Sequence, residues 1–240
     1  MRRVLSALRQ LGPFAVLLLL SGCALAGTAV AGNASAPSAP FATTAPAAGS
    51  PSAPPLPLPP AAETDVVTVV VVGDSITAGT GPNDRADTPG PQSWQHGFWG
   101  APLEFRGGWA VPGATTEQMQ AGAAGLAADV LVLLGGTNDL ATGVGWPASQ
   151  EHLLGVVAAV GEGHVVLSAI PPSDFFPARV LDFNAQLAAL AQQQGWEFVD
   201  PWVAVSQGGA FVPGTSPDGI HPTPEVAGQA GAVIRAAVLT

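Results

Sequence analysis

The 240-residue sequence contains one cysteine, no lysine and only seven arginines. A single cysteine excludes an internal disulfide, so an exported domain would be held together by its hydrophobic core alone. Between residues 65 and 240 there are four arginines and sixteen acidic residues, which gives this part a formal net charge of 4 − 16 = −12. A domain this acidic, with no basic patch, is poorly suited to bind nucleic acid.

The usual sequence signatures of metal and cofactor sites are also missing. There is no His-Glu-x-x-His motif and no cluster of cysteines and histidines, so we expect no metal site. The segment Gly79-Thr80-Gly81 is too short and misplaced for a dinucleotide-binding loop. Ser75 does not lie in a Gly-x-Ser-x-Gly elbow, because residue 77 is threonine, and this disfavours the α/β-hydrolase fold. We therefore expect that the protein uses no cofactor.

The first 22 residues have the pattern of an export signal. Three arginines come early, residues 14–20 are apolar, and small residues follow. The apolar run is shorter than the roughly 20 residues that a membrane-spanning helix needs, although an uncleaved signal anchor is an alternative. Leu20-Ser21-Gly22-Cys23 resembles the lipobox of bacterial lipoproteins, which implies that Cys23 is lipidated and becomes the mature N-terminus. Plain secretion after cleavage nearby is the other interpretation.

Residues 23–64 read as a linker that follows the lipidated Cys23. They are mostly alanine, proline, serine, threonine and glycine, with almost no charge. Such a segment has too little large apolar surface to offset the entropy lost on ordering. Its prolines favour the extended polyproline conformation, so we expect a semi-stiff spacer that lifts a folded domain away from a membrane. Residues 65–240 are long enough to form one domain with a full core.

Within residues 65–240, short apolar runs alternate with segments of helical periodicity. The first run, DVVTVVVVG, lacks polar alternation, as in a strand that is buried on both faces. We expect strands at 65–73, 105–114, 129–136, 164–172 and 196–201, and helices at about 115–128, 149–160, 178–195 and 224–239. This order predicts a mostly parallel sheet with helices on both faces. Ligands of such sheets bind beyond the carboxyl ends of the strands.

Residues with catalytic potential follow the expected strands at that edge. Ser75 follows the first strand, Gly113 lies at the end of the second and Asn138 follows the third, whereas Asp218 and His221 precede the last helix. These residue types suit acyl transfer. A serine hydroxyl becomes a nucleophile when a histidine takes its proton, and an aspartate orients that histidine. The N–H groups of Ser75 and Gly113 and the amide of Asn138 could donate to a developing oxyanion.

Four blocks carry a resemblance to a known family. They are GDS at 73–75, PGATT at 112–116, GTND at 136–139 and DGIH at 218–221. Each block is common alone, but the four occur in family order, each near an expected strand end. The sequence therefore resembles the SGNH (GDSL-type) hydrolase family over essentially all of residues 65–240.

The resemblance implies both a fold and a set of roles. The fold is a three-layer α/β/α sandwich with a five-stranded, mostly parallel sheet of flavodoxin-like type. Ser75 is the nucleophile and His221 is the base, with Asp218 beside it. The backbone of Ser75, together with Gly113 and Asn138, forms the oxyanion hole. The family's reaction is the hydrolysis of carboxylic esters.

Several of these residues also have structural interpretations. Ser75 could simply cap a helix. We expect Asp74 to hydrogen-bond within its turn, and Asp139 to orient Asn138 or to cap a helix. Glycine at position 136 would let the backbone pass close to a bound acyl group.

Aromatic side chains gather in the loops around the expected site. They are Trp94, Phe98 and Trp99 in the loop 93–102, and Trp146, Phe175 and Phe176 in other loops. Such residues could stack on sugar rings or line an acyl groove. The alternative is that they form a small hydrophobic cluster that covers the long loops.

The sequence as a whole predicts an exported serine esterase that is lipid-anchored to the membrane and faces outward. Its substrate would be a small-molecule, glycan or lipid ester, such as an O-acylated glycan or glycolipid. One alternative is acyl transfer to a sugar hydroxyl, which would use the same residues. Another is a non-catalytic glycan-binding lipoprotein on the same fold. The sequence indicates no oligomeric state.

Overall fold

The computed structural model describes residues 65–82, 84–161 and 163–240. The predicted signal peptide, residues 1–22, and the predicted linker with Cys23, residues 23–64, lie outside the described residues. The described part contains the predicted catalytic residues and all of the predicted strands and helices.

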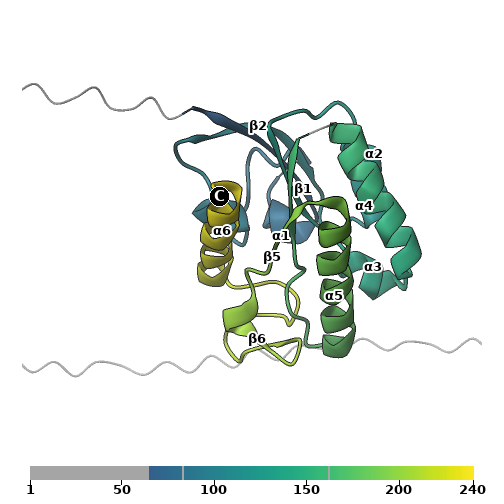
Figure 1. Ribbon diagram of the computed structural model, residues 1–240. Helices are drawn as coiled ribbons and strands as arrows, with labels where there is room; N and C mark the ends of the chain where they lie inside the picture. Colours follow the sequence, from purple (N-terminus) through teal and green to yellow (C-terminus); the bar gives the residue numbers. More distant parts are fainter. Residues whose placement is uncertain (1–64, 83, 162) are drawn as a thin grey trace, which may run out of the picture. The chain divides into compact units, whose positions relative to one another are not determined.

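The described residues form a five-stranded sheet with the order β2-β1-β3-β4-β5 (Figure 1). All neighbouring strands are parallel. The strands are β1 (Val67–Gly73), β2 (Leu103–Ala110), β3 (Val130–Leu134), β4 (His164–Ser168) and β5 (Glu197–Val199). The predicted α/β fold with a five-stranded parallel sheet is confirmed.

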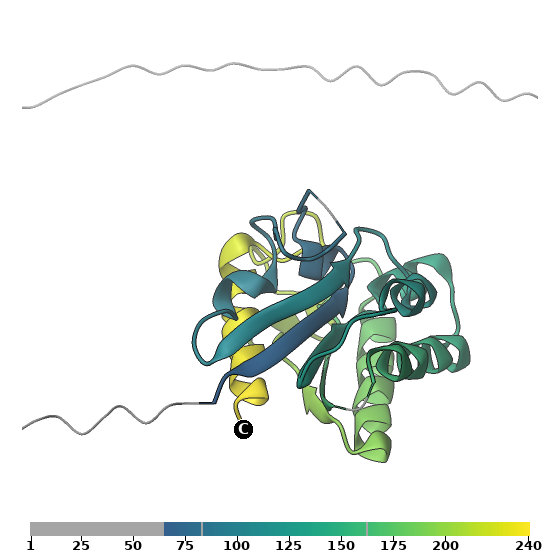
Figure 2. The ribbon, with the colours of Figure 1, turned by 90° about the horizontal axis from the view of Figure 1, so that it is seen from above.

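Helices cover both faces of this sheet and complete the three-layer arrangement (Figure 2). The valines of β1 show why. Val69 and Val71 are buried with α1, η1 and α6, whereas Val70 and Val72 are buried with α2, α4 and α5. The helices are α1 (Ser75–Ala78), η1 (Trp94–Gly97), α2 (Thr116–Gly122), α4 (Trp146–Val160), α5 (Pro177–Gln194) and α6 (Pro224–Val238). A strand that is buried on both faces needs no polar alternation, which explains the valine run.

The strand order determines where a ligand can bind. The chain runs from β1 outward to β2 and then returns to place β3 on the other side of β1. Loops at such a switch point diverge at the carboxyl ends of the strands and leave a crevice. Here the two diverging loops are the GDS turn after β1 and the GTND block after β3. The last three residues of that block lie within a short helix, α3 (Thr137–Thr142).

Some elements differ from the sequence prediction. The second strand begins at residue 103 rather than 105, and α2 ends at Gly122 rather than near residue 128. A turn closed by the N–H of Leu126 and the carbonyl of Ala123 follows α2 and leads the chain to β3. The short elements α3, η1, η2 (Val203–Val205) and the hairpin of β6 (Ser206–Gln207) and β7 (Ala210–Phe211) were not predicted. None of the helices in the described ranges is long and apolar enough to cross a bilayer.

Candidate active site

The turn after β1 presents a serine at the start of α1. Asp74 is the N-cap of this helix, and its Oδ1 accepts a hydrogen bond of 2.9 Å from the N–H of Ile76. Ser75 is therefore the first residue of the helix and not its cap, which leaves its side chain free for another partner. Asp74 is buried, as expected for a residue that holds the turn, whereas Ser75 remains partly exposed.

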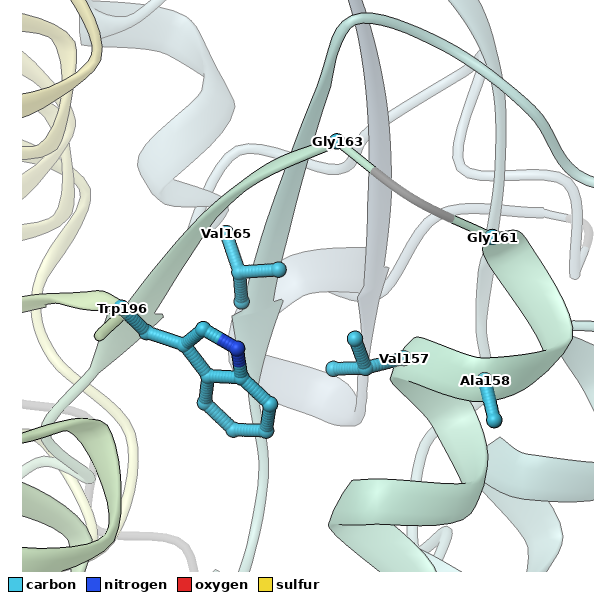
Figure 3. A pocket seen from close by; sticks show the side chains of 6 residues that line it. All are labelled: Val157, Ala158, Gly161, Gly163, Val165 and Trp196. Atoms are coloured by element: carbon cyan, nitrogen blue, oxygen red, sulfur yellow. The ribbon is translucent and has the colours of Figure 1, made fainter. Parts of the chain in front are cut away.

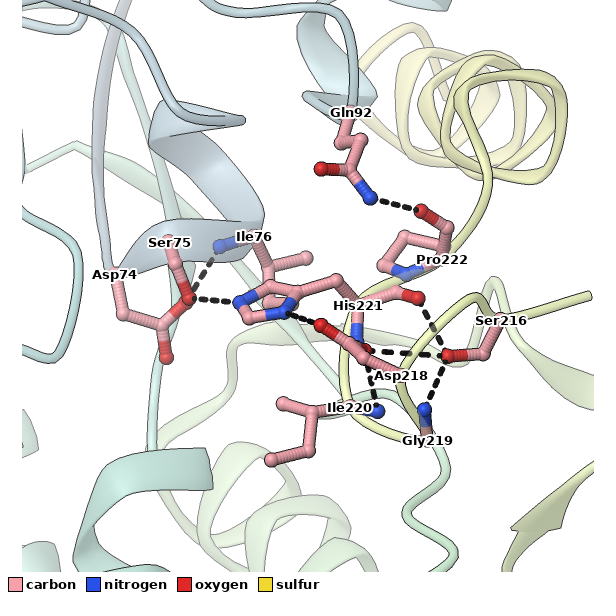
Figure 4. Close-up of polar contacts among 10 residues, drawn as sticks. All are labelled: Asp74, Ser75, Ile76, Gln92, Ser216, Asp218, Gly219, Ile220, His221 and Pro222. Atoms are coloured by element: carbon pink, nitrogen blue, oxygen red, sulfur yellow. Dashed lines mark hydrogen bonds and ion pairs between the residues drawn. The ribbon is translucent and has the colours of Figure 1, made fainter. Parts of the chain in front are cut away.

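The partner of Ser75 is His221, which comes from the loop before α6 (Figure 4). The Ser75 Oγ lies 2.9 Å from the Nε2 of His221, and the Nδ1 of His221 lies 2.7 Å from the Oδ2 of Asp218. Both distances are in hydrogen-bonding range. When Nδ1 carries the proton and donates to Asp218, Nε2 accepts from the serine hydroxyl. The three side chains thus form a continuous Ser-His-Asp relay.

The turn that carries Asp218 and His221 is held by further hydrogen bonds. The Oδ1 of Asp218 accepts from the N–H groups of Ile220 and His221, at 3.0 and 2.8 Å. The Oγ of Ser216 accepts from the N–H of Gly219 at 2.8 Å and donates to the carbonyl of His221 at 2.6 Å. Ser216 was not among the predicted site residues, although Ser-Pro-Asp-Gly at 216–219 is a typical turn sequence.

A second support comes from a residue with no local sequence signal. The side-chain amide of Gln92 donates a hydrogen bond of 3.1 Å to the carbonyl of Pro222, directly after His221. The two residues are 130 positions apart in the chain, so no local pattern could have linked them.

These contacts also fix the charge of Asp218. Desolvation would raise the pKa of its carboxyl, but hydrogen bonds from the backbone N–H and ring of His221 and from the Ile220 N–H lower it to about 2. The carboxylate is consequently ionised at neutral pH. An ionised Asp218 can orient the His221 ring and stabilise its protonated form.

Asn138, the second residue of α3, connects the other two turns of the site. Its Nδ2 donates to the carbonyl of Ala114 at 2.9 Å and lies 3.4 Å from the Oδ2 of Asp74. Ala114 follows Gly113, and Asp74 precedes Ser75. The structure therefore brings all five predicted site residues to one edge of the sheet, with Ser75, His221 and Asp218 in direct contact.

The donors expected for an oxyanion hole are available. Gly113 has a φ of +83°, which favours glycine, and it is exposed. Within the described residues, the N–H groups of Ser75 and Gly113 donate to no protein acceptor. The 3.4 Å contact from Asn138 to Asp74 is long for a hydrogen bond, so that N–H can be redirected toward a substrate oxygen at little cost.

Burial gives Asp74 different electrostatics from Asp218. Desolvation raises the pKa of the Asp74 carboxyl to about 7, against the opposing effects of the Ile76 N–H and the charge of His221. The nearby Asp139 raises this pKa further. Asp74 thus changes protonation near neutral pH, whereas Asp218 stays charged.

Asp139 has a structural role instead of orienting Asn138. Its buried carboxylate accepts hydrogen bonds from the N–H of Thr116 at 2.9 Å, from the hydroxyl of Thr116 at 2.6 Å and from the hydroxyl of Ser149 at 2.8 Å. Thr116 is the first residue of α2, and Ser149 lies in the first turn of α4. Asp139 therefore caps α2 and fastens both helices to α3.

Packing against α5 gives a reason for glycine at position 136. Gly136 has a φ of +127°, and a Cβ there would lie 2.2 Å from the ring of Phe183. The backbone before Asn138 thus packs directly against an aromatic ring of α5. This contact sets the position of the loop that carries the amide.

The aromatic residues of the loops divide into two groups. Trp94, Phe98 and Trp99 form consecutive edge-to-face contacts, and the first two are fully buried beneath α6. They belong to the core and not to a ligand groove. Trp146 instead lies half-buried at the start of α4, edge-on to Phe183. Phe175 is 68% exposed in the loop before α5.

A search of the described residues for groups of three or more His, Cys, Asp or Glu side chains that could hold a metal ion finds none.

Comparisons with known proteins concern the family and the fold of the chain. The model of a family described as GDSL-like lipase/acylhydrolase matches residues 71–227, a span that includes all four sequence blocks. A search of curated proteins gives no significant match.

Solved structures share the fold. A protein from Desulfitobacterium hafniense, described as lipolytic and of the G-D-S-L family, is 16% identical and has a TM-score of 0.57, covering 71% of this chain and 99% of its own. A member of the lipolytic G-D-S-L family from Veillonella parvula is 17% identical with a TM-score of 0.53, covering 72% and 96%. A GDSL-like lipase from Bacteroides thetaiotaomicron is 20% identical with a TM-score of 0.52, covering 72% and 87%. At these identities the likeness extends to the fold alone.

Proposed function

Since the chain belongs to the GDSL-like lipase/acylhydrolase family and is thus an ester-hydrolysing serine hydrolase, we propose that Ser75 is its nucleophile. The observation that carries this proposal is the unbroken relay from the Ser75 hydroxyl through His221 to Asp218. Each neighbouring pair in this relay is within hydrogen-bonding distance. A histidine in this position can take the serine proton as the hydroxyl attacks a carbonyl.

In the acylation step, the Oγ of Ser75 attacks the ester carbonyl carbon while its proton moves to the Nε2 of His221. The negative charge that develops on the carbonyl oxygen is stabilised by the N–H groups of Ser75 and Gly113 and by the amide of Asn138. The ionised Asp218 stabilises the protonated imidazole. The intermediate then collapses, and His221 returns the proton to the departing alcohol, which leaves an acyl group on Ser75.

Deacylation reverses these roles with water as the attacking group. His221 takes a proton from the water molecule as its oxygen attacks the acyl carbon, and the same three donors stabilise the oxyanion. Collapse of this second intermediate breaks the bond to Ser75 Oγ, which recovers its proton from Nε2. The products are one alcohol and one carboxylic acid for each ester and each water consumed.

We place this reaction outside the cytoplasm, on O-acylated glycans or glycolipids. The support is the sequence: an export signal at residues 1–22, a lipobox that ends at Cys23, and a proline-rich spacer before the catalytic domain. In this proposal the acyl group of Cys23 anchors the enzyme to the membrane, and the spacer gives the domain access to esters near the cell surface. An enzyme that is secreted without a lipid anchor would reach the same substrates.

Hydrolysis of p-nitrophenyl esters of graded acyl length tests the proposed function. The wild-type chain is expected to release both p-nitrophenol and the free acid, which distinguishes hydrolysis from transfer to another alcohol. Ser75→Ala is expected to lose the activity while keeping its circular dichroism spectrum, and Ser206→Ala, a serine of β6 outside the relay, is expected to keep it. A folded Ser75→Ala protein with wild-type activity would overturn the assignment.

A further inference from the structure

A groove lies between α4 and α5, and Leu140 of α3, two residues after Asn138, lines one end of it. It consists of two adjoining hollows of about 210 and 70 Å³, which share Trp146 and Gln186 in their walls. The larger hollow is also lined by Arg179 and Asp182, and the smaller one by Gln150 and Gln193. We call these two hollows the α4–α5 groove.

The polar side chains of the groove form a row along one face of α5. Arg179, Asp182, Gln186 and Gln193 follow one another at intervals of three, four and seven residues, which places them on the same side of the helix. The row spans about 21 Å at 1.5 Å per residue. Neither Arg179 nor Asp182 forms an ion pair with another described residue. The guanidinium of Arg179 lies over the Phe176 ring, 5.8 Å from its centroid, and the Nε2 of Gln186 donates to the carbonyl of Asp182 at 3.0 Å. The carboxylate of Asp182 and the Oε1 of Gln186 accept no hydrogen bond from another described residue, so they can accept from a ligand.

Trp146 forms an aromatic wall in the middle of the groove. Its ring centroid lies 5.2 Å from that of Phe183, and the ring planes are at 86°, so an edge-to-face contact fixes the orientation of the indole. Within the described part of the chain no group accepts a hydrogen bond from the indole N–H. Phe183 also packs against the backbone of Gly136, two residues before Asn138. Phe183 thus contacts both Trp146 and the loop that carries the expected oxyanion donor Asn138.

We propose that the α4–α5 groove binds the uncharged sugar chain of an O-acylated glycan substrate. An indole offers a flat apolar face for the C–H face of a pyranose ring, and the side-chain amides both donate to and accept from sugar hydroxyls. The domain's formal charge of −12 disfavours polyanionic ligands. The inference rests on the proposed esterase function, since the bound chain would present its acyl group to Ser75.

A second cavity provides an internal control. It measures about 370 Å³ and is lined by Trp196 with Val157, Ala158 and Val165 (Figure 3). It lies beside the beginnings of β4 and β5, at the opposite end of the sheet from Ser75. The described side chains that line it are apolar apart from the indole nitrogen, so they offer few groups to hold sugar hydroxyls. Trp196 is thus a partly exposed tryptophan like Trp146, but it lies at the other end of the sheet and among apolar side chains.

Binding can be measured without turnover in the Ser75→Ala background of the full chain. Xylotetraose, cellotetraose and chitotetraose are titrated separately by isothermal calorimetry. At least one is expected to bind saturably, with the Kd raised about tenfold by Trp146→Ala and severalfold by Gln186→Ala, because the central contacts of a binding site carry most of its affinity. Trp196→Ala is expected to leave the Kd unchanged. The absence of binding by all three sugars, or equal effects of the two tryptophan substitutions, would overturn the proposal.

Kinetics of the enzyme with an intact Ser75 give a second test. Trp146→Ala and Gln186→Ala are expected to raise KM for acetylated xylan severalfold while kcat/KM for p-nitrophenyl acetate stays within twofold of wild type. Equal losses on both substrates would mean that the groove serves only to support the catalytic loop. If the wild-type chain hydrolysed no ester at all, the proposed function would be wrong. The binding experiment would still show whether the α4–α5 groove binds sugar chains.

Discussion

At the scale of single residues, the site contains two carboxyl groups with opposite electrostatics. Asp74 is fully buried and has a pKa raised to about 7, whereas Asp218 is half-exposed and has a pKa lowered to about 2. The buried group makes one strong hydrogen bond, whereas the exposed one accepts from the backbone and ring of His221 and from Ile220. Because their environments differ in this way, Asp218 remains charged at neutral pH, whereas Asp74 gains or loses its proton there.

The raised pKa of Asp74 predicts a pH-dependent stability. Between pH 3.8 and about 7 the folded state holds a proton on Asp74 that the unfolded state releases, so the free energy of unfolding falls as pH rises through this window. We expect the stability of the wild type relative to Asp74→Asn to fall by about 2 to 3 kcal/mol between pH 5 and pH 8. Urea denaturation of both proteins at the two pH values measures this difference. If the stability difference between the wild type and Asp74→Asn were the same at pH 5 and pH 8, burial would not raise the pKa of Asp74.

Asn138→Ala tests the expected oxyanion donor. Loss of one such donor is expected to lower kcat by about 10²–10³ with little change in KM, because the contact forms mainly in the transition state. Asn184→Ala is the matched control, since Asn184 binds only the backbone of Ile170 and is expected to affect stability rather than kcat of the folded enzyme. Steady-state kinetics on p-nitrophenyl acetate measure both variants. Equal kcat values for Asn138→Ala and the wild type would exclude the role.

Residue types and spacing reveal part of this site from sequence. Asp218 and His221 are three positions apart in a turn, which lets both side chains point the same way, and the structure places them in contact. The burial of Asp74 and its contact with Asn138, 64 positions away, depend on strand order and could not be read from local sequence. The same holds for the support that Gln92 gives to the turn of His221.

At the scale of secondary-structure elements, Asp139 is the point at which α2, α3 and α4 are joined. We expect Asp139→Ala to lower the free energy of unfolding by about 3 kcal/mol or more, because it leaves the buried N–H and hydroxyl of Thr116 and the hydroxyl of Ser149 without their acceptor. The exposed Asp182→Ala should change it by less than about 0.5 kcal/mol. Chemical denaturation of both variants is the test, and equal stabilities would refute the role of Asp139.

Helix and strand centres were easier to predict than their ends. The strands with continuous β-branched or leucine runs, β1 and β3, matched closely because burial on both faces leaves a clear pattern. The predicted continuation of α2 beyond residue 122 failed because alanine-rich sequence after it favours helix, while the chain has to turn there to enter β3. The six residues of α3 are too few to give a periodic signal.

At the scale of the whole molecule, the topology explains why sequence blocks far apart form one site. In the order β2-β1-β3-β4-β5, the carboxyl ends of β1 and β3 lie side by side, so Ser75 and Asn138 become neighbours. The alternation of strands and helices was sufficient to predict this edge. It was not sufficient to predict the burial of Trp94 and Phe98 under α6, which depends on packing between segments more than 120 residues apart.

The N-terminal region gives a prediction about location. If Cys23 is the lipidated residue, Cys23→Ala should move the protein from the membrane fraction to the soluble or unprocessed fraction, because the anchor is lost. A serine of the predicted spacer, Ser35→Ala, is the control and should leave the distribution unchanged. Fractionation and mass spectrometry of the mature N-terminus measure the outcome. Wild-type protein found only in the medium, with an N-terminus beyond Cys23, would contradict the anchor.

The central claim is that Ser75 is the nucleophile of a serine hydrolase, and covalent labelling tests it most directly. A fluorophosphonate probe reacts with an activated serine hydroxyl, and peptide mass spectrometry identifies the residue that carries it. We expect a single adduct on Ser75, formed at one equivalent with parallel loss of esterase activity and absent in Ser75→Ala. An adduct on a different serine, or full esterase activity in enzyme whose Ser75 is completely labelled, would contradict it.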